Sequence, residues 1–178
     1  MVSGSPEQFP VAVIGAGPVG LSAAAQLATR GLDFVVLEAG DQIGASVRDW
    51  AHVRMFSPWR FNTDPAARAL LEATGWAAPE PEALPTGGEL IDEYLAPLAA
   101  HPAIAPHVRL GATVTVVARQ DFDKVRTGGR DASPFLIRLA DGSELLASAV
   151  IDASGTWRTP NPLGGSGIPA HGEAAAVA

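Results

Sequence analysis

A glycine-rich turn near the N-terminus constrains the fold of this 178-residue chain more than any other feature. The apolar residues 11–14 lead into Gly15-Ala16-Gly17-Pro18-Val19-Gly20, which has the spacing G-x-G-x-x-G. The first glycine allows a tight bend, the second lets a pyrophosphate approach the backbone, and the third lets helix and strand pack closely. Glu38 ends a second apolar run, where a carboxylate can accept hydrogen bonds from a ribose diol. This order of strand, turn, helix, strand and acid predicts a dinucleotide site.

Residues 8–29 contain no charged side chain, so a membrane-spanning helix is the main structural alternative for this segment. Three glycines and Pro18 interrupt the segment, and only its alanine-rich second part, residues 21–28, has the composition of a helix. Strand, turn and helix therefore explain the pattern better than one membrane helix. No basic segment precedes it, which argues against a secretory signal.

The composition sets further limits on function. A net charge of −7 argues against a general nucleic-acid or anionic-membrane surface. The absence of cysteine excludes a disulfide framework and a cysteine-ligated metal, and makes the cytoplasm the default compartment. None of the histidines is spaced like a metal-binding pair, so no metal site is expected; they are His52, His101, His107 and His171.

The first two thirds of the chain predict a βαβ unit followed by further helices. Residues 1–9 are expected to be a disordered leader, followed by a strand at 10–15, a helix at 18–30 and a strand at 33–38. Residues 39–62 are expected to form a long irregular segment. Asp64-Pro65 predicts the start of a helix at 66–74. Thr86 and Glu89 form a capping box for a further helix, which Pro97 is expected to kink or end.

From Val108 the hydrophobic pattern changes to a period of two, which is typical of strands. Strands are expected at residues 108–118, 135–139 and 145–151, and Asp141-Gly142 predicts a hairpin turn between the last two. Together they predict a three-stranded antiparallel unit. Its last strand runs into Asp152-Ala153-Ser154-Gly155-Thr156-Trp157.

This order of elements resembles the FAD-binding half of flavoproteins with two dinucleotide-binding domains, a superfamily that includes flavin-containing monooxygenases. The fold class it implies is α/β: a Rossmann-like FAD-binding domain with a parallel βαβ start and an additional three-stranded antiparallel unit. Residues 10–160 would be an incomplete FAD-binding domain, and residues 161–178 a Pro/Gly/Ala-rich tail toward a missing NAD(P)H domain. Because there is a single G-x-G-x-x-G motif, a truncated chain is expected.

The resemblance also implies which residues contact FAD. At the pyrophosphate it places the residues of the glycine turn: Gly15, Gly17, Pro18, Val19 and Gly20. It places Glu38 at the adenosine ribose with Ala39 beside it, and the backbone of Val114 at the adenine. Ala153 and Gly155 would lie close to the cofactor, and Trp50 and Asn62 near the flavin. Asn62-Thr63 is equally consistent with a helix-capping pair. No catalytic residue is assigned.

The loop before Asp64 carries both aromatic and basic side chains: Arg48, Trp50, Arg54, Trp59 and Arg60. In one interpretation the aromatic rings wall the flavin and an arginine meets cofactor phosphate or substrate. In the other they only pack a large loop. The acidic net charge makes a nucleic-acid patch the weakest interpretation.

The function implied by the resemblance is that of an NAD(P)H-dependent FAD oxidoreductase, most like a monooxygenase acting on a small molecule. Hydride would pass from NAD(P)H to the flavin, and the reduced flavin would react with O2. A homodimer, or a partner chain that supplies the missing domain, is consistent with this function. Two alternatives stay open: a non-catalytic nucleotide-binding or interaction module, and a simple NAD-linked dehydrogenase domain.

Overall fold

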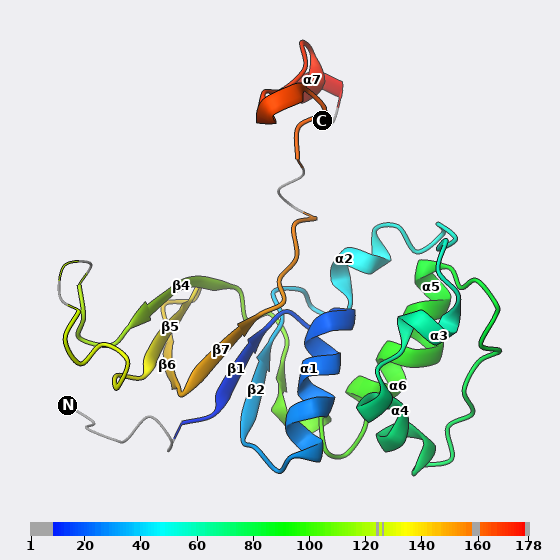
Figure 1. Cartoon of the computed structure of the whole chain (residues 1–178), viewed down its shortest axis with the longest axis horizontal. Helices are drawn as coiled ribbons and strands as arrows, with labels where there is room; N and C mark the ends of the chain where they lie inside the picture. Colours follow the sequence, from blue (N-terminus) through cyan, green and yellow to red (C-terminus); the bar gives the residue numbers. More distant parts are fainter. Residues whose placement is uncertain (1–8, 124, 126, 158–160, 177–178) are drawn as a thin grey trace.

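The computed structural model describes residues 9–123, 125, 127–157 and 161–176. It has a four-stranded parallel sheet, a separate three-stranded antiparallel sheet and a group of helices (Figure 1). The expected leader at residues 1–9 lies, apart from Phe9, outside the described residues. The predicted α/β class, with a parallel start and an antiparallel unit, is confirmed.

The parallel sheet has the strand order β3-β2-β1-β7. Its strands are β1 (Val11–Ile14), β2 (Phe34–Leu37), β3 (Val108–Arg109) and β7 (Ala149–Asp152). Val11 pairs with Phe34 on one side and with Ala149 on the other, so the carboxyl ends of β1, β2 and β7 lie level at one edge. Ligands of open α/β sheets bind outside this edge.

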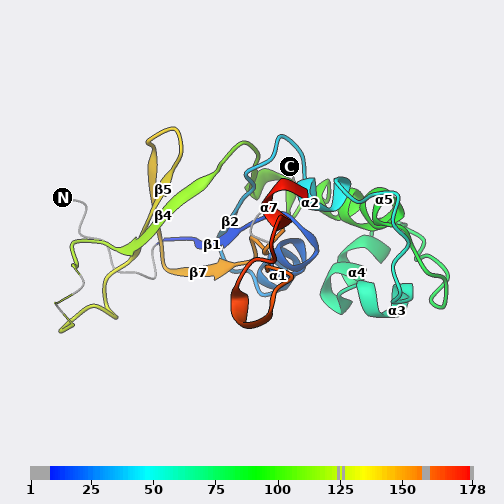
Figure 2. The same ribbon diagram turned by 90° about the horizontal axis from the view of Figure 1, so that it is seen from above.

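Both faces of the parallel sheet are covered, because alternate side chains enter two different cores. Val13 and Val36 pack with α1 (Pro18–Thr29) and the other helices, whereas Ala12 and Val35 pack against the antiparallel sheet. Buried parallel strands need apolar residues on both faces, and the continuously apolar β1 and β2 provide them. Figures 1 and 2 both show the parallel sheet with α1 between the antiparallel sheet and the remaining helices.

The antiparallel sheet has the order β4-β5-β6, from β4 (Val114–Arg119), β5 (Phe135–Leu139) and β6 (Glu144–Ala147). Gly142, with φ +84°, makes the predicted turn between β5 and β6. This sheet is an excursion of the chain between β3 and β7, two strands of the parallel sheet.

Two expected strands are each divided between the two sheets. The expected strand at 108–118 breaks at Gly111 (φ +65°) into β3 and β4, where Gly111 N–H donates to the Gly40 carbonyl (2.8 Å). The expected strand at 145–151 breaks at Ser148, whose N–H donates to the Pro10 carbonyl (3.0 Å), into β6 and β7. The single-strand predictions were wrong because an alternating pattern does not say which sheet a strand joins.

The remaining helices before β4 are short, and Figure 1 shows most of them on the side of α1 away from the antiparallel sheet. They are α2 (Ala45–Arg48), α3 (Trp59–Asn62), α4 (Pro65–Glu72), α5 (Gly87–Leu90), the π-helix η2 (Ile91–Leu95), α6 (Ala96–Ala99) and the 3₁₀ turn η3 (Ala105–His107). The predicted N-cap at Asp64 and the Thr86–Glu89 capping box are both present. The helix runs past Pro97 to Ala99, so this proline does not end it. The Glu93 carbonyl, which the proline cannot engage, accepts a bond from the Trp76 indole N–H (2.7 Å).

The last described segment holds the 3₁₀ turn η4 (Gly165–Gly167) and α7 (Glu173–Ala176), which stand apart from both sheets (Figure 1). Among the described residues no helix has the length and apolar character needed to cross a membrane. The boundaries of the FAD-binding domain and of the tail stay predictions.

Candidate cofactor-binding site

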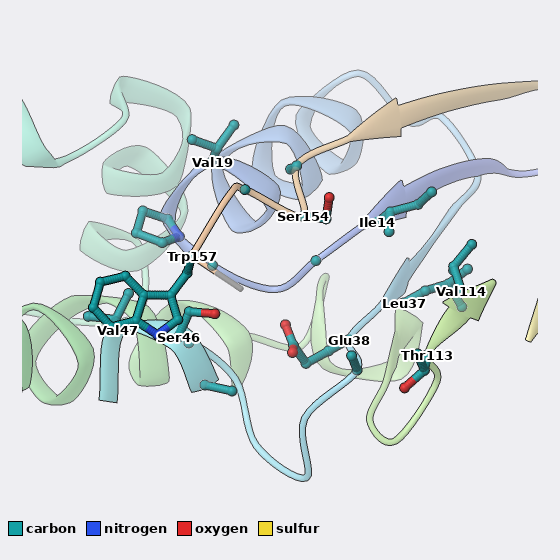
Figure 3. A pocket seen from close by; sticks show the side chains of 18 of the residues that line it. Ile14, Val19, Leu37, Glu38, Ser46, Val47, Thr113, Val114, Ser154 and Trp157 are labelled. Atoms are coloured by element: carbon teal, nitrogen blue, oxygen red, sulfur yellow. The ribbon is translucent and has the colours of Figure 1, made fainter. Parts of the chain in front are cut away.

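A cavity of about 550 Å³ opens at the carboxyl ends of β1, β2 and β7 (Figure 3). Its walls come from the turn after β1, the start of α1, the end of β2, α2, residues 112–114 and residues 153–157. Sequence positions more than 100 residues apart therefore meet in one pocket, because the parallel register brings the strand ends to one edge.

Most of the twelve residues predicted to contact the cofactor lie together in this pocket. Nine of them line it: Gly15, Gly17, Pro18, Val19, Glu38, Ala39, Val114, Ala153 and Gly155. Gly20, Trp50 and Asn62 are not among the lining residues. The predicted contact of each of the twelve with FAD stays a prediction.

The three glycines of the turn have different surroundings. Gly15 has φ +99°, and a Cβ there would lie 2.7 Å from the Ala153 carbonyl oxygen. A Cβ on Gly20 would lie 1.9 Å from the Gly15 carbonyl oxygen. Gly17 has an ordinary extended backbone (φ −84°), and a Cβ there would meet no atom within 4 Å. The space in front of Gly17 is thus a cradle within the cavity that a ligand can enter.

The N-terminus of α1 borders the cavity, and no side chain caps its free N–H groups or neutralises its partial positive charge. Gly17 is the N-cap, no side chain caps the helix, and no acidic residue lies in its first turn. Val19, which lines the cavity, is 68% exposed. The first-turn N–H groups and the positive end of the helix dipole therefore suit a phosphate group.

Glu38 is buried, with 8% of its surface exposed, and both of its carboxylate oxygens accept backbone hydrogen bonds. The N–H of Ala16, inside the glycine turn, donates to Oε2 (2.6 Å), and the N–H of Gly40 donates to Oε1 (2.9 Å). Each carboxylate oxygen can accept more than one bond, so acceptor capacity remains toward the cavity that Glu38 lines. Glu38 also joins the end of β2 to the glycine turn after β1.

The chain leaving β7 forms one wall of the cavity. The Ser154 hydroxyl and its backbone N–H both donate to Asp152 Oδ1 (2.7 and 3.0 Å), and these bonds lower the pKa of Asp152. Three residues later, the Trp157 indole N–H donates to Asp49 Oδ2 (2.8 Å). Figure 3 shows Trp157 beside Ser46 and Val47 of α2, at the opposite end of the cavity from Glu38 and Val114.

Sequence reasoning missed two parts of this wall as site residues. One is the start of α2, where Gly44, Ala45, Ser46 and Val47 line the cavity. Its signal was Gly44, which has φ +65° and whose N–H donates to the Ala16 carbonyl (3.0 Å). The other is Trp157, which lines the cavity and is bonded to Asp49, 108 positions earlier in the chain. No local sequence pattern marks such a residue as part of the wall.

The aromatic and basic loop has mainly local contacts. The Trp50 ring packs over Gly87, where a Cβ would come within 2.7 Å of it. The Asn62 amide donates to the carbonyls of Ser57 (2.7 Å) and Pro58 (3.1 Å), so it closes the turn before and within α3. These contacts support the loop-packing interpretation for both residues.

The loop arginines differ in how fully they are bonded. Arg54 donates to the Leu84 carbonyl (2.6 Å), and Arg60 pairs with Glu82. The Nε atom of Arg48, on α2, is buried and has no hydrogen-bond partner in the part of the chain that the structure describes. None of the three lines the cavity.

The charge of the cavity is unusual for an anion site. Glu38 is the single charged side chain among the described lining residues, and none of them is Lys or Arg. A phosphate there would depend on backbone N–H groups and the α1 dipole alone. No group of three or more His, Cys, Asp or Glu side chains that suits a metal ion occurs within the described ranges.

The glycine turn, the uncapped helix N-terminus, the buried acid and the parallel strand order define a Rossmann-type dinucleotide-binding domain. The chain matches the FAD dependent oxidoreductase family over residues 10–165. It therefore belongs to this family, and the predicted resemblance and cofactor are confirmed at this level.

Individual relatives point to monooxygenases. The chain is 35% identical over 156 residues to the indole-3-pyruvate monooxygenase YUCCA1 of Oryza sativa subsp. japonica, covering 83% of this chain and 32% of that protein. The structure of a flavin-containing monooxygenase from Stenotrophomonas maltophilia is similar with a TM-score of 0.62 and 30% identity, over 88% of this chain and 42% of that one.

A more distant structure shares the fold. The complex of OTEMO with FAD and NADP has a TM-score of 0.62 at 20% identity, over 90% of this chain and 27% of that one. The chain thus spans about a third of the length of the curated relative and about two fifths of the Stenotrophomonas protein.

Proposed function

We propose that this chain holds FAD in the cavity at the carboxyl ends of β1, β2 and β7, as the FAD-binding portion of an NAD(P)H-dependent monooxygenase that oxidises a small molecule. The observation that carries the proposal is the cradle in front of Gly17, between the uncapped start of α1 and the buried carboxylate of Glu38. Family membership supports FAD as the dinucleotide.

The residues of the cavity fit the ADP half of FAD in a simple order. The first-turn N–H groups of α1 would hold the pyrophosphate, which can approach the backbone at Gly17. Glu38 would accept hydrogen bonds from the adenosine ribose, and Val114 would lie beside the adenine. The flavin half would then extend from the pyrophosphate toward α2 and Trp157.

When bound, the flavin supplies hydride acceptance and reaction with O2. The described residues would bind and orient it: the glycine turn would hold the phosphates, Glu38 would hold the ribose, and Ala45 and Val47 of α2 would add apolar surface to the cavity wall. The sites for NAD(P)H and substrate would come from a further domain, in the same protein or in a partner chain. We also propose a cytoplasmic location, supported by the absence of cysteine.

A simple NAD-linked dehydrogenase is the less favoured candidate. Its sheet would continue with further βα units after β3, whereas this chain inserts the antiparallel sheet β4-β5-β6 before returning to β7. A non-catalytic module that binds the cofactor would have the same cavity, so only the chemistry of the complete protein separates it from the monooxygenase proposal.

Direct titration tests the proposal. Purified chain mixed with FAD should quench flavin fluorescence and retain yellow colour through gel filtration, while NAD should give no comparable thermal protection. Absence of FAD binding would refute the proposal, and protection by NAD alone would favour the dehydrogenase.

The ribose assignment predicts that Glu38→Gln and Glu38→Ala each weaken FAD binding by at least about tenfold, roughly the loss of one hydrogen bond to a charged group. The control is Glu80→Ala, which removes an exposed carboxylate outside the cavity. Circular dichroism checks that each variant is folded. Unchanged affinity in folded Glu38→Gln would show that Glu38 does not bind the ribose.

A further inference from the structure

The segment that leaves β7 forms one wall of the cavity, and a hydrogen bond holds its far end. Residues 153–157 line the cavity, and the Trp157 indole N–H donates to Asp49 Oδ2 (2.8 Å), a residue 108 positions earlier in the chain. Asp49 is the C-cap of α2, whose residues 45–47 also line the cavity. One hydrogen bond therefore joins the end of this segment to the end of α2, and Figure 3 shows Trp157 beside Ser46 and Val47 of that helix.

The two ends of this segment are held differently. At its base, Asp152 accepts two bonds from Ser154, and Ala153 N–H continues the sheet by donating to the Ile14 carbonyl (2.9 Å). At its far end, Trp157 is 52% exposed and belongs to neither hydrophobic core. The end at Trp157 can therefore detach without disturbing the packed interior.

A pivot lies between these two ends. Gly155 has φ +71°, and a Cβ there would meet no atom within 4 Å. Glycine adopts this positive φ without steric cost and has the widest choice of backbone conformations, so it suits a pivot. Because the acceptor at Asp49 is a carboxylate, the bond to Trp157 is stronger than one between neutral groups, yet it remains exposed and reversible.

We propose that Trp157 and Asp49 form a latch that closes residues 153–157 over the cavity and limits the rate at which FAD enters and leaves. The inference rests on the proposed function, since it concerns the same cavity. Both partners of the bond belong to the protein, so we expect the latch to act on the barrier to exchange rather than on the affinity of the site. Trp157 and Asp49 are positioning residues in this scheme.

Stopped-flow flavin fluorescence tests the latch. Asp49→Ala, at a residue outside the cavity lining, should raise both the association and the dissociation rate constants by about three- to tenfold, while Kd stays within about twofold. Trp157→Phe, which keeps a ring but loses the N–H, should raise the two rate constants to the same extent. The double variant should be no faster than either single variant, because both remove the same bond. Asp49→Asn retains a carbonyl acceptor and should stay close to the unaltered chain.

Three results would overturn the proposal: unchanged rates, a rise in the dissociation rate alone with weaker Kd, or additive effects in the double variant. The second result would make Trp157 an ordinary contact residue.

A second measurement needs no FAD. Hydrogen exchange of the ligand-free chain should be faster at residues 153–157 in Asp49→Ala than in the unaltered chain, and unchanged at β1. Equal exchange would reject the latch even if FAD binds. Faster exchange in a chain that does not bind FAD would keep the latch and reject the proposed function.

Discussion

The three glycines of the turn after β1 are required for three different reasons. Gly15 needs its positive φ and its close approach to Ala153, and Gly20 needs room beneath the Gly15 carbonyl. Neither reason involves a ligand. Gly17 has an ordinary backbone and open space in front of it, so nothing within the described protein requires a glycine there. A glycine at position 17 would be required only by a ligand that enters the cavity and approaches the backbone there.

This difference predicts opposite behaviour for two substitutions in one motif. Gly17→Ala should leave the free energy of unfolding within about 0.5 kcal/mol of the unaltered chain but weaken FAD binding at least about tenfold. Gly20→Ala should lower the free energy of unfolding by about 1–3 kcal/mol, because the added methyl group overlaps the Gly15 carbonyl. Urea titration and FAD titration measure the two effects.

The matched control is Gly128→Ala, at an exposed glycine with no atom within 4 Å of an added Cβ. It should alter neither quantity. FAD affinity unchanged in Gly17→Ala would remove the main support for a pyrophosphate at that position.

The start of α4 connects three helical elements through one residue. Asp64 Oδ1 accepts bonds from Ala66 N–H (2.9 Å) and Ala67 N–H (3.1 Å), and Gln26 on α1 donates to the same carboxylate. The Asp64 N–H donates to the Tyr94 hydroxyl of η2 (2.9 Å), and burial raises the pKa of Tyr94. Asp64 therefore fixes how α4 lies against α1 and η2.

Asp64→Ala should lower the free energy of unfolding by about 1–2 kcal/mol, because α4 loses its N-cap and Gln26 loses its acceptor. Urea unfolding followed by circular dichroism measures the change. Asp64→Asn keeps a side-chain acceptor and should lose only a few tenths of a kcal/mol. Equal losses in the two variants would mean that the charge, and not the cap, stabilises this joint.

The molecule as a whole is acidic, with a net charge of −7, and so is its cavity. Neither Lys nor Arg occurs among the described lining residues, so a dianionic pyrophosphate would bind there without ion pairs. Backbone N–H groups act at short range and are little affected by salt, whereas the overall repulsion between protein and ligand is screened by it.

Raising NaCl from about 20 to about 300 mM should therefore change the Kd for FAD by less than about threefold, with association becoming faster rather than slower. Fluorescence titration and stopped-flow mixing at both concentrations test this. Val19→Lys, which adds a cation at the exposed start of α1, should bind FAD more tightly at low salt and lose this gain at high salt. A steep weakening of the unaltered chain with salt would indicate phosphate contacts to cationic side chains.

Much of the fold was predictable because its signals are local. The G-x-G-x-x-G turn, the Asp64 cap, the Thr86–Glu89 capping box and the Asp141-Gly142 hairpin each depend on residues a few positions apart. The same holds for the site residues around Gly17 and Glu38. Short-range geometry determines these features, so the sequence alone determined that the chain has a dinucleotide-type βαβ start and an antiparallel unit.

Tertiary structure alone decided which sheet each strand joins and where residues 153–157 line the cavity. Residues 108–118 alternate and residues 145–151 are apolar except for Ser148, yet each run divides between two sheets, at Gly111 and at Ser148. Trp157 reaches Asp49 only because β7 pairs with β1 and directs its exit toward α2. Period and composition describe which face of a strand is buried, whereas partner choice depends on contacts between residues far apart in the chain, which no local pattern records.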